Sequence, residues 1–329
     1  MITAIVPVWN GRDLLARLLA TLETQTLPAG ELLVIDNGSS DGAPELARSR
    51  GARVIAMGRN VGFAAAVNRG IREARGERIA VLNSDVELAP DYFQILSAAE
   101  GWFATGKSLQ GGAGAKIDRD KIDGTFDAVC RGGTAWRVGS GRSDGPVFSS
   151  PCDIVSPPWT AVVFRAELFA RVGYLEESFE SYLEDVDFGL RCARQKLHGR
   201  YLPDAVARHL GSATLGKWHP ETVRRIARNQ VLLLSRHYAP HTLLRCVWPI
   251  LLAQLLWGCV AMRHGHGFAW LRGKVQGFRN FQESRGREFD PGLLEHLRAN
   301  ECLIREIQDS TGSDTYWKLY LTLTGSGVK

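Results

Sequence analysis

The stretch Arg78–Leu88, RIAVLNSDVEL, most constrains the fold of this chain, because an apolar run is followed at once by a polar, acidic turn. We interpret Ile79–Leu82 as a buried strand and the turn as its exposed end. In open α/β sheets, ligands bind where the strands end. Asp85 and Glu87 have no Lys or Arg between them, and such carboxylates favour a hard divalent cation. For this stretch alone, an exposed acidic turn is the alternative.

The residues before this stretch alternate apolar runs with segments of helical spacing. Strands are predicted at Ile2–Val8, Leu32–Ile35 and Arg53–Ala56, and each is followed by a polar turn. Leucines recur at the helical period between positions 14 and 22, and a helix of small residues opens within 60–70. This alternation predicts an α/β fold with a doubly wound, mostly parallel, Rossmann-like sheet.

Residues 101–108, GWFATGKS, match the phosphate-binding pattern GxxxxGK[ST]. A P-loop needs a strand before it and a helix that opens at the lysine. Here a helix-like segment precedes the match, and Leu109-Gln110-Gly111-Gly112 follows it. We therefore interpret the match as a chance occurrence.

The middle of the chain is less regular. Residues 118–157 are rich in Gly, Asp and Ser, so a long loop is predicted there. Order returns with a strand at 159–164, a helix at 167–171 and a final short strand at Ala205–His209. Glu184, Asp185 and Asp187 open a further predicted helix, over 186–196, where the helix dipole favours acids. Helix capping alone would account for one or two of these three.

The tail differs in composition from the rest. A basic helix is predicted at 221–237, and Cys246–Met262 holds 17 residues with Gln254 as its one polar member, flanked by Arg245 and Arg263. Three alternatives stay open for this apolar segment: a helix in a membrane surface, a buried domain helix, or a membrane span. We predict a catalytic domain at 1–217 and a helical extension at 218–329.

Composition narrows the class of protein. Hydrophobic residues make up 45% and charged residues 23%, as in folded soluble proteins. A net charge of +5 is too small to indicate a nucleic-acid partner. Six cysteines without CxxC pairs indicate reduced thiols in a cytoplasmic protein. The chain enters its first strand directly, without a secretion signal, so export is not expected.

Six motifs together resemble the inverting glycosyltransferases of family 2, which have the GT-A fold. The resemblance covers residues 1–215 and is strongest to the rhamnosyltransferase-like subgroup of bacterial surface polysaccharide synthesis. The motifs are IVPVWN (5–10), VIDNGSSDG (34–42), NVGFAAAVNRG (60–70), LNSDVEL (82–88), YLEDVDFGLR (182–191) and ARHLGSA (207–213).

The resemblance implies a role for each matching position. Asp36 would bind the pyrimidine base of a UDP- or dTDP-sugar, and Asp185 would be the general base. Trp159 and Glu184 would face the acceptor, a saccharide. If the apolar segment Cys246–Met262 associates with a membrane, this acceptor would be lipid-linked. The other implied nucleotide contacts are Pro7, Val8, Asn10, Asn60, Gly62, Asn83 and Ser84.

The implied cofactor is Mn²⁺ or Mg²⁺, with Asp85 as a direct ligand and His209 as a further one. One departure affects this site, because Asn83 stands where the family's metal motif has its first acid. A neutral residue there weakens the electrostatic hold on the ion.

These observations lead to an enzyme as the main hypothesis: a metal-dependent inverting glycosyltransferase, peripheral on the inner face of the plasma membrane. The alternative is a non-catalytic nucleotide-sugar-binding protein on the same fold. A nucleotidylyltransferase is disfavoured because Val8–Arg12 lacks a glycine-rich basic loop. A dehydrogenase is disfavoured because no GxGxxG follows the first strand.

Overall fold

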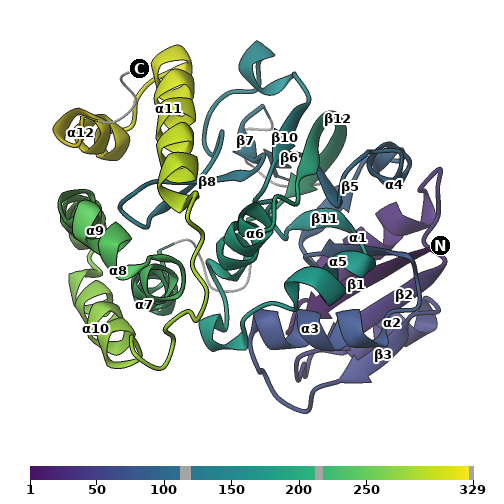
Figure 1. Cartoon of the computed structure of the whole chain (residues 1–329). Coiled ribbons are helices and arrows are strands. Elements are labelled where there is room, and N and C mark those ends of the chain that lie inside the picture. Colours follow the sequence, from purple (N-terminus) through teal and green to yellow (C-terminus); the bar gives the residue numbers. More distant parts are fainter. Residues whose placement is uncertain (112–119, 212–217, 326–329) are drawn as a thin grey trace. The chain divides into compact units, whose positions relative to one another are not determined.

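The computed structural model describes residues 1–111, 120–211 and 218–325 (Figure 1). The chain divides into two compact units. The first contains residues 1–126 and 139–214, and the second contains residues 127–138 and 215–329.

The first unit is built on a large sheet whose N-terminal strands are parallel. The strands β1 (Ile2–Val8), β2 (Glu31–Asp36), β3 (Arg53–Ala56) and β4 (Arg78–Leu82) lie in the order β3-β2-β1-β4. Nearly every residue of β1 is buried, because both faces of this part of the sheet are covered. The predicted alternation of strand and helix is therefore confirmed.

The remaining strands extend the sheet with mixed directions. β11 (Ala161–Arg165) joins β4 antiparallel, β6 (Phe103–Gln110) joins β11 antiparallel, and β12 (Gly199–His209) runs parallel to β6. Three short antiparallel strands complete it: β5 (Val86–Leu88) and β10 (Cys152–Ile154) on β12, and β7 (Ile122–Gly124) on β6.

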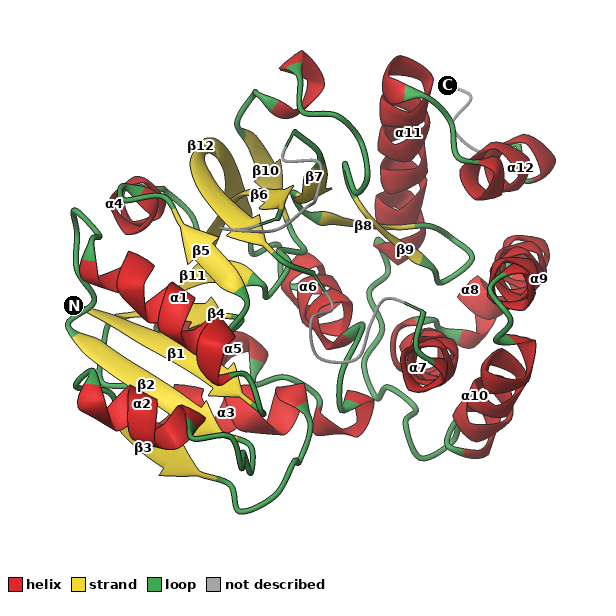
Figure 2. Cartoon of the chain, turned by 180° about the vertical axis from the view of Figure 1, so that it is seen from behind, coloured by secondary structure: helices red, strands yellow, loops and turns green. Residues whose placement is uncertain are grey.

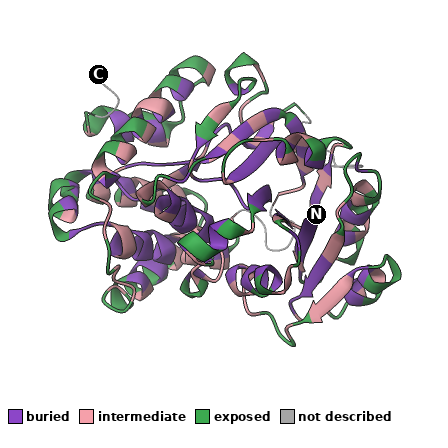
Figure 3. Ribbon diagram, turned by 45° about the vertical axis from the view of Figure 1, so that its right-hand side comes forward, coloured by how far each residue is buried: buried purple, intermediate pink, exposed green. Residues whose placement is uncertain are grey.

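Helices cover both faces of this sheet (Figure 2). One hydrophobic cluster joins strand residues to α1 (Arg12–Glu23), α2 (Ala43–Ser49) and α4 (Tyr92–Ser97). A second cluster, on the other face, contains residues of α3 (Phe63–Glu73), α5 (Glu167–Val172) and α6 (Glu184–Arg194). Figure 3 shows buried residues concentrated in the strands and on the inner sides of the helices. Because both faces are covered, polar groups gather at the strand ends.

Two expectations about the middle of the chain have clear outcomes. Residues 103–108 of the P-loop-like match lie in the buried strand β6, which agrees with the rejection of a P-loop. The long loop predicted at 118–157 is wrong for its described part, which contains β7, β10, the hairpin β8 (Asp127–Val129) and β9 (Ala135–Arg137), and a 3₁₀ turn, η1 (Pro146–Phe148). Three-residue strands are too short to give a period in the sequence.

The second unit consists of helices and the β8–β9 hairpin. Its helices are α7 (Pro220–His237), α8 (Pro240–Arg245), α9 (Val247–Arg263), α10 (Gly267–Arg279), α11 (Leu293–Thr311) and α12 (Thr315–Leu323). Among the described residues, no helix has the length and apolar character that crossing a membrane requires.

The hairpin is held to these helices by partly buried hydrogen bonds. Arg131 donates from its backbone N and its Nε to the two carboxylate oxygens of Glu301 on α11, both at 2.8 Å. Tyr320 on α12 donates to the same carboxylate at 2.7 Å, and Gln254 on α9 donates to Gly132 O at 2.8 Å. The second unit thus includes residues 127–138, which the sequence division at 217/218 had assigned to the first domain.

Candidate active site

The predicted nucleotide contacts lie where the parallel strands end. Asp36 is the last residue of β2 and is paired in register with Val8, the last residue of β1. Its Oδ1 accepts a hydrogen bond from Ser39 N at 2.8 Å, which holds the next turn in place. Pro7 lies one position before this edge, opposite Ile35. The sheet therefore brings these contacts to one edge.

The turn after β1 is held by side chains from the turn after β2. Asn10 has a positive φ of 49°, and its Oδ1 accepts a hydrogen bond from Ser40 N at 2.8 Å. Arg12 N donates to Asp41 Oδ2, also at 2.8 Å. A surface depression is lined by Asp41 and residues 10–14. It lies at the start of α1, where backbone N–H groups and the helix dipole favour an anion.

Asn37 is a structural residue that the sequence reading missed. Its amide nitrogen donates to Asn60 Oδ1 and to Gly62 O, both at 3.2 Å, and its oxygen accepts from Val61 N at 3.0 Å. Asn60 and Gly62, both predicted nucleotide contacts, are thus fastened to the end of β2. No pattern in the sequence distinguishes this asparagine from those of ordinary turns.

Asp85 and His209 are brought together by strand pairing. β5 pairs antiparallel with the end of β12, so that His209 lies opposite Val86. His209 Nε2 is 3.1 Å from Asp85 Oδ1. Asn83 and Ser84 lie in the same turn, and a Cβ at Gly11 would come 3.6 Å from Ser84 Oγ. The turn after β4 is therefore close to the turn after β1.

A third side chain, Asp123 on β7, completes this group and was not predicted. Its Oδ2 is 2.8 Å from His209 Nδ1. β6 lies between the two strands, because it pairs with β7 at Leu109 and with His209 at Gln110. Asp123 was missed because it belongs to the segment that was predicted to be a loop. Only the strand pairing brings it to the site.

The two carboxylates determine the charge of His209. Burial disfavours the imidazolium, but the hydrogen bonds to Asp123 and Asp85 outweigh it and raise the pKa of His209 to about 10. In the metal-free protein the two carboxylates therefore favour the protonated ring, and a metal ion bound at Nε2 would have to displace that proton. In the described part of the chain, no group of three His, Cys, Asp or Glu side chains is arranged to hold a metal by itself.

Asp85 and His209 nevertheless fit a metal ion whose other ligands come from a substrate. Two ligands at about 2.1 Å from one octahedral ion are about 3 Å apart, and Asp85 Oδ1 and His209 Nε2 are separated by 3.1 Å. Mg²⁺ in phosphate-transfer sites is often held by one or two protein groups and completed by substrate phosphates. Two protein ligands are therefore enough for such a site.

The backbone just before the acidic start of α6 is strained. Glu184 and Asp185 are the first residues of α6, and both are buried. Glu180, Tyr182 and Leu183 before them have φ values of 61°, 74° and 67°, which L-residues seldom adopt. Together with Asn10, they are four of the five non-glycine residues with positive φ in the described ranges. Strain of this kind concentrates at functional sites.

The segment before α6 is fixed by its contact with the start of α3. Ala64 N donates to Glu180 O at 3.0 Å, and a Cβ at Gly62, where φ is +90°, would come 2.9 Å from the same oxygen. A glycine is needed at position 62 for both reasons. The loop that contains Gly62 and the segment before the acidic start of α6 are thereby in direct contact.

Asp187 has a different environment from Asp185. Its side chain is fully buried and accepts a hydrogen bond from Arg191 Nε at 3.0 Å. Arg191 also donates to Val172 O and Tyr174 O at 2.7 and 2.8 Å. The pair therefore ties α6 to the segment after α5. This geometry agrees with the structural role that the helix position indicated for Asp187.

Trp159 does not lie where the sequence reading placed it. Only 2% of its surface is exposed, and its ring packs on Phe164 and Phe188 with centroids 4.6 and 5.0 Å apart. A side chain so deeply buried offers no surface to a saccharide. The predicted acceptor contact is wrong for this residue, which belongs to the core beneath α6.

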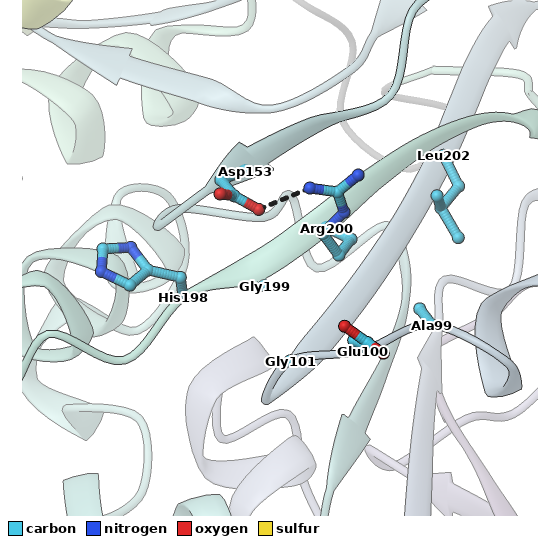
Figure 4. A pocket seen from close by; sticks show the side chains of 8 residues that line it. All are labelled: Ala99, Glu100, Gly101, Asp153, His198, Gly199, Arg200 and Leu202. Carbon is cyan, nitrogen blue, oxygen red and sulfur yellow. Dashed lines mark hydrogen bonds and ion pairs between the residues drawn. The ribbon is translucent and has the colours of Figure 1, made fainter.

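A second depression lies at the other end of the mixed strands, near the start of β12 (Figure 4). Its lining includes an ion pair between Asp153 and Arg200, 2.7 Å apart and partly exposed. His209 ends the same strand at its opposite end. This depression is therefore separate from the candidate site.

Comparison with known proteins identifies the fold and the class of enzyme. Residues 3–99 match the profile of Glycosyl transferase family 2. The N-acetylglucosaminyl-diphospho-decaprenol L-rhamnosyltransferase of Mycobacterium tuberculosis is 27% identical over 238 residues, covering 62% of this chain and 74% of that protein. The succinoglycan biosynthesis protein ExoO of Rhizobium meliloti is 31% identical over 185 residues, covering 54% of this chain and 47% of that protein.

A solved structure supports the same fold. GalNAc-T7 with UDP, GalNAc and Mn²⁺ aligns with a TM-score of 0.60 at 13% identity, covering 86% of this chain and 56% of that one. The chain thus spans a little over half the length of that structure, and at this identity the likeness concerns the fold. The protein is a glycosyltransferase whose residues 3–99 match the family 2 profile and whose fold is of the GT-A type.

Proposed function

We propose that the protein transfers a sugar from a UDP- or dTDP-sugar to a saccharide acceptor by a single, inverting, metal-dependent displacement. The observation that carries this proposal is the meeting of Asp85, His209 and Asp123 at the strand edge that also holds Asp36. A sugar nucleotide needs a base pocket and a neutralised diphosphate, and this edge offers groups for both.

Asp36 is the proposed partner of the pyrimidine base. Its carboxylate accepts a hydrogen bond from the N3–H of uracil or thymine, a donor that the corresponding position of cytosine lacks. The turn around Asn10, together with Asn60 and Gly62, encloses the nucleoside. Asn83 and Ser84 lie beside Asp85 and would contact the ribose and the diphosphate.

Asp85 and His209 are the proposed ligands of Mn²⁺ or Mg²⁺. When bound, the ion offsets the negative charge that develops on the leaving diphosphate. Asp123 acts as a positioning residue, because its hydrogen bond to Nδ1 orients the ring of His209 with Nε2 toward Asp85. Carboxylates that hold the second nitrogen of a ligating histidine commonly have this effect.

Asp185 is the proposed general base. It accepts the proton of the acceptor hydroxyl while that oxygen forms a bond to the anomeric carbon and the bond to the diphosphate breaks. One displacement of this kind inverts the configuration at the anomeric carbon. Glu184, next to it at the start of α6, is the proposed acceptor contact.

The acceptor is proposed to be lipid-linked, and the enzyme to work at the inner face of the plasma membrane. The M. tuberculosis relative is named for transfer of L-rhamnose to a decaprenol-diphosphate-linked sugar, which supports this class of acceptor. A dTDP-activated deoxysugar is therefore a donor to be tested with the UDP-sugars.

The experiment that tests the proposal combines donor binding with turnover. Binding to the folded state raises the melting temperature by mass action, so UDP-, dTDP- and GDP-sugars are compared with and without Mn²⁺. The best donor is then used with labelled sugar and a lipid-linked saccharide. We expect product with Mn²⁺, none in EDTA, and no rescue of Asp85→Ala by added metal. Full activity of Asp85→Ala in chelator would refute the metal-dependent mechanism.

A further inference from the structure

The second unit carries a long basic segment without acids. Residues 222–282 contain nine Lys and Arg residues and no Asp or Glu. Arg224 and Arg225 pair with Glu221, just before this segment. In contrast, four exposed arginines, none of which forms an ion pair among the described residues, lie at or near the ends of α9 and along α10: Arg245, Arg263, Arg272 and Arg279. The segment therefore presents uncompensated positive charge.

The same two helices expose large apolar side chains. On α9 these are Val247, Trp248, Leu251, Leu255 and Met262, and on α10 they are Phe268, Leu271, Val275 and Phe278. Spacings of three and four residues place each set along one side of its helix. Phe268 and Phe278 are 80% and 67% exposed. Contiguous apolar surface of this kind marks an interaction site in soluble proteins.

Packing explains why these side chains point outward. A Cβ at Gly273 or Gly277 of α10 would come within 2.2–2.6 Å of atoms of α7, so that side of α10 is in close contact with α7. A Cβ at Gly258 of α9 would come 2.9 Å from the indole of Trp270 on α10. The small residues thus occupy the inner sides of the helices, and the apolar stripes occupy the outer sides.

Gln254, the one polar residue of the apolar segment, also points inward. It interacts with Lys274 Nζ, which donates to Ala227 O at 3.0 Å and to Gln230 Oε1 at 2.8 Å. The outer side of α9 is therefore apolar from Val247 to Met262. We call the outer sides of α9 and α10, with the four arginines, the apolar-basic face.

We propose that the apolar-basic face binds an anionic lipid surface, with both helices lying in the interface. Apolar side chains enter the acyl region, and the arginines contact lipid phosphates. A second copy of the chain fits less well, because it would bring the same uncompensated arginines together, and like charges across an interface are costly. The proposal does not depend on the transferase reaction, and its test uses no substrate.

The test is flotation of the full-length protein with lipid vesicles. We expect binding to vesicles of equal parts phosphatidylcholine and phosphatidylglycerol, and much weaker binding to phosphatidylcholine alone. Each Arg→Gln change at positions 263, 272 and 279 should weaken binding about fivefold. Phe268→Ser with Phe278→Ser should weaken it tenfold or more. Leu27→Ser with Val147→Ser is the matched control, since these exposed side chains belong to the first unit and lie outside the face.

Several results would overturn the proposal. Absence of binding to anionic vesicles at low salt is one, and equal binding to neutral vesicles is another. Unchanged binding of the double serine variant, with a normal circular dichroism spectrum, is a third. Sedimentation that shows a dimer lost in Phe268→Ser/Phe278→Ser would assign the face to a second copy.

Discussion

The two units bury a cationic side chain in opposite ways. In the first, His209 is held between the carboxylates of Asp85 and Asp123, and its pKa is raised to about 10. In the second, the described contacts of Lys274 are neutral oxygens, and burial lowers its pKa to about 7. Both groups are buried, so the charge of the partner decides whether burial retains or removes the proton.

The difference has opposite consequences for stability as the pH changes. His209 has a folded-state pKa above its ordinary 6.5, so in the metal-free protein its contribution is complete below pH 6.5 and is lost as the pH rises through about 10. Lys274 has a folded-state pKa below its ordinary 10.5. Between pH 7 and 10.5 the unfolded chain binds the extra proton, so its contribution to stability increases with pH.

Replacement of the proposed base should have the largest effect on catalysis. This residue lies in the first unit, so the second unit should be unaffected. Asp185→Asn keeps the shape but cannot accept the proton, so kcat should fall by about 10²–10⁴ while donor affinity is retained. Asp187→Asn is the comparison, because that acid is paired with Arg191 and should mainly lower the melting temperature. A normal kcat for Asp185→Asn, with a loss in Glu184→Gln, would show that the neighbouring acid is the base.

Replacement of Asp123, one of the two carboxylates that contact His209, should have the second largest effect, a loss of metal affinity. Asp123→Asn leaves Asp85 and His209 in place but weakens the orientation of the ring, and such changes cost about 10–100-fold in affinity. Calorimetric titration of Mn²⁺ measures this without turnover. Asp144→Asn, at the neighbouring ion pair with Lys107 (2.8 Å), is the control and should bind Mn²⁺ normally. Equal affinity in both variants would exclude the positioning role.

The nucleotide pocket should show a smaller loss. Asp36→Ala leaves the base N3–H without its partner, which costs about 1–3 kcal/mol and weakens UDP or dTDP binding about tenfold or more. Asp41→Ala disturbs the adjacent turn without removing a base contact, so it should have a lesser effect. If calorimetry gives the same affinity for Asp36→Ala and the wild type, the base pocket lies elsewhere.

Lys274→Met should leave turnover unchanged and act on stability alone. The variant removes the proton linkage, so its stability relative to the wild type should decrease from pH 7 to pH 10, with a slope of at most about 1.4 kcal/mol per pH unit. Thermal unfolding of both proteins across this range measures the difference. A parallel pair of curves would mean that the lysine keeps its proton despite burial.

Much of the first unit could be predicted from the sequence because its strands are long and apolar. The strand ends place Asp36 and Asp85 at one edge of the sheet, and the pairing of β5 with β12 places His209 beside Asp85. The role of Asp185, at the start of α6, was implied by the family resemblance and stays a prediction. Asp123 and Asn37 could not be found in this way. Their importance arises from contacts with residues distant in the chain, and β7 has only three residues.

The directions of two other side chains could not be predicted for a similar reason. Trp159 lies outside the six motifs, and its position in the sequence does not indicate whether the side chain faces the core or a ligand. Gln254 was correctly noted as the one polar residue of an apolar segment, yet its direction depends on Lys274, 20 residues later. A sequence pattern describes one helix or strand at a time. The directions of the Trp159 and Gln254 side chains are set by neighbouring elements.

The hairpin at residues 127–138 has a consequence for how the chain is made. It leaves the ribosome early, but the helices that bury Cys130 and pair with Arg131 are encoded about 100–190 residues later. Until α11 and α12 are synthesised, the cation of Arg131 and the apolar side chains of the hairpin have no place to pack. Removal of the C-terminal helices would therefore leave the hairpin without the side chains that pair with it and pack on it.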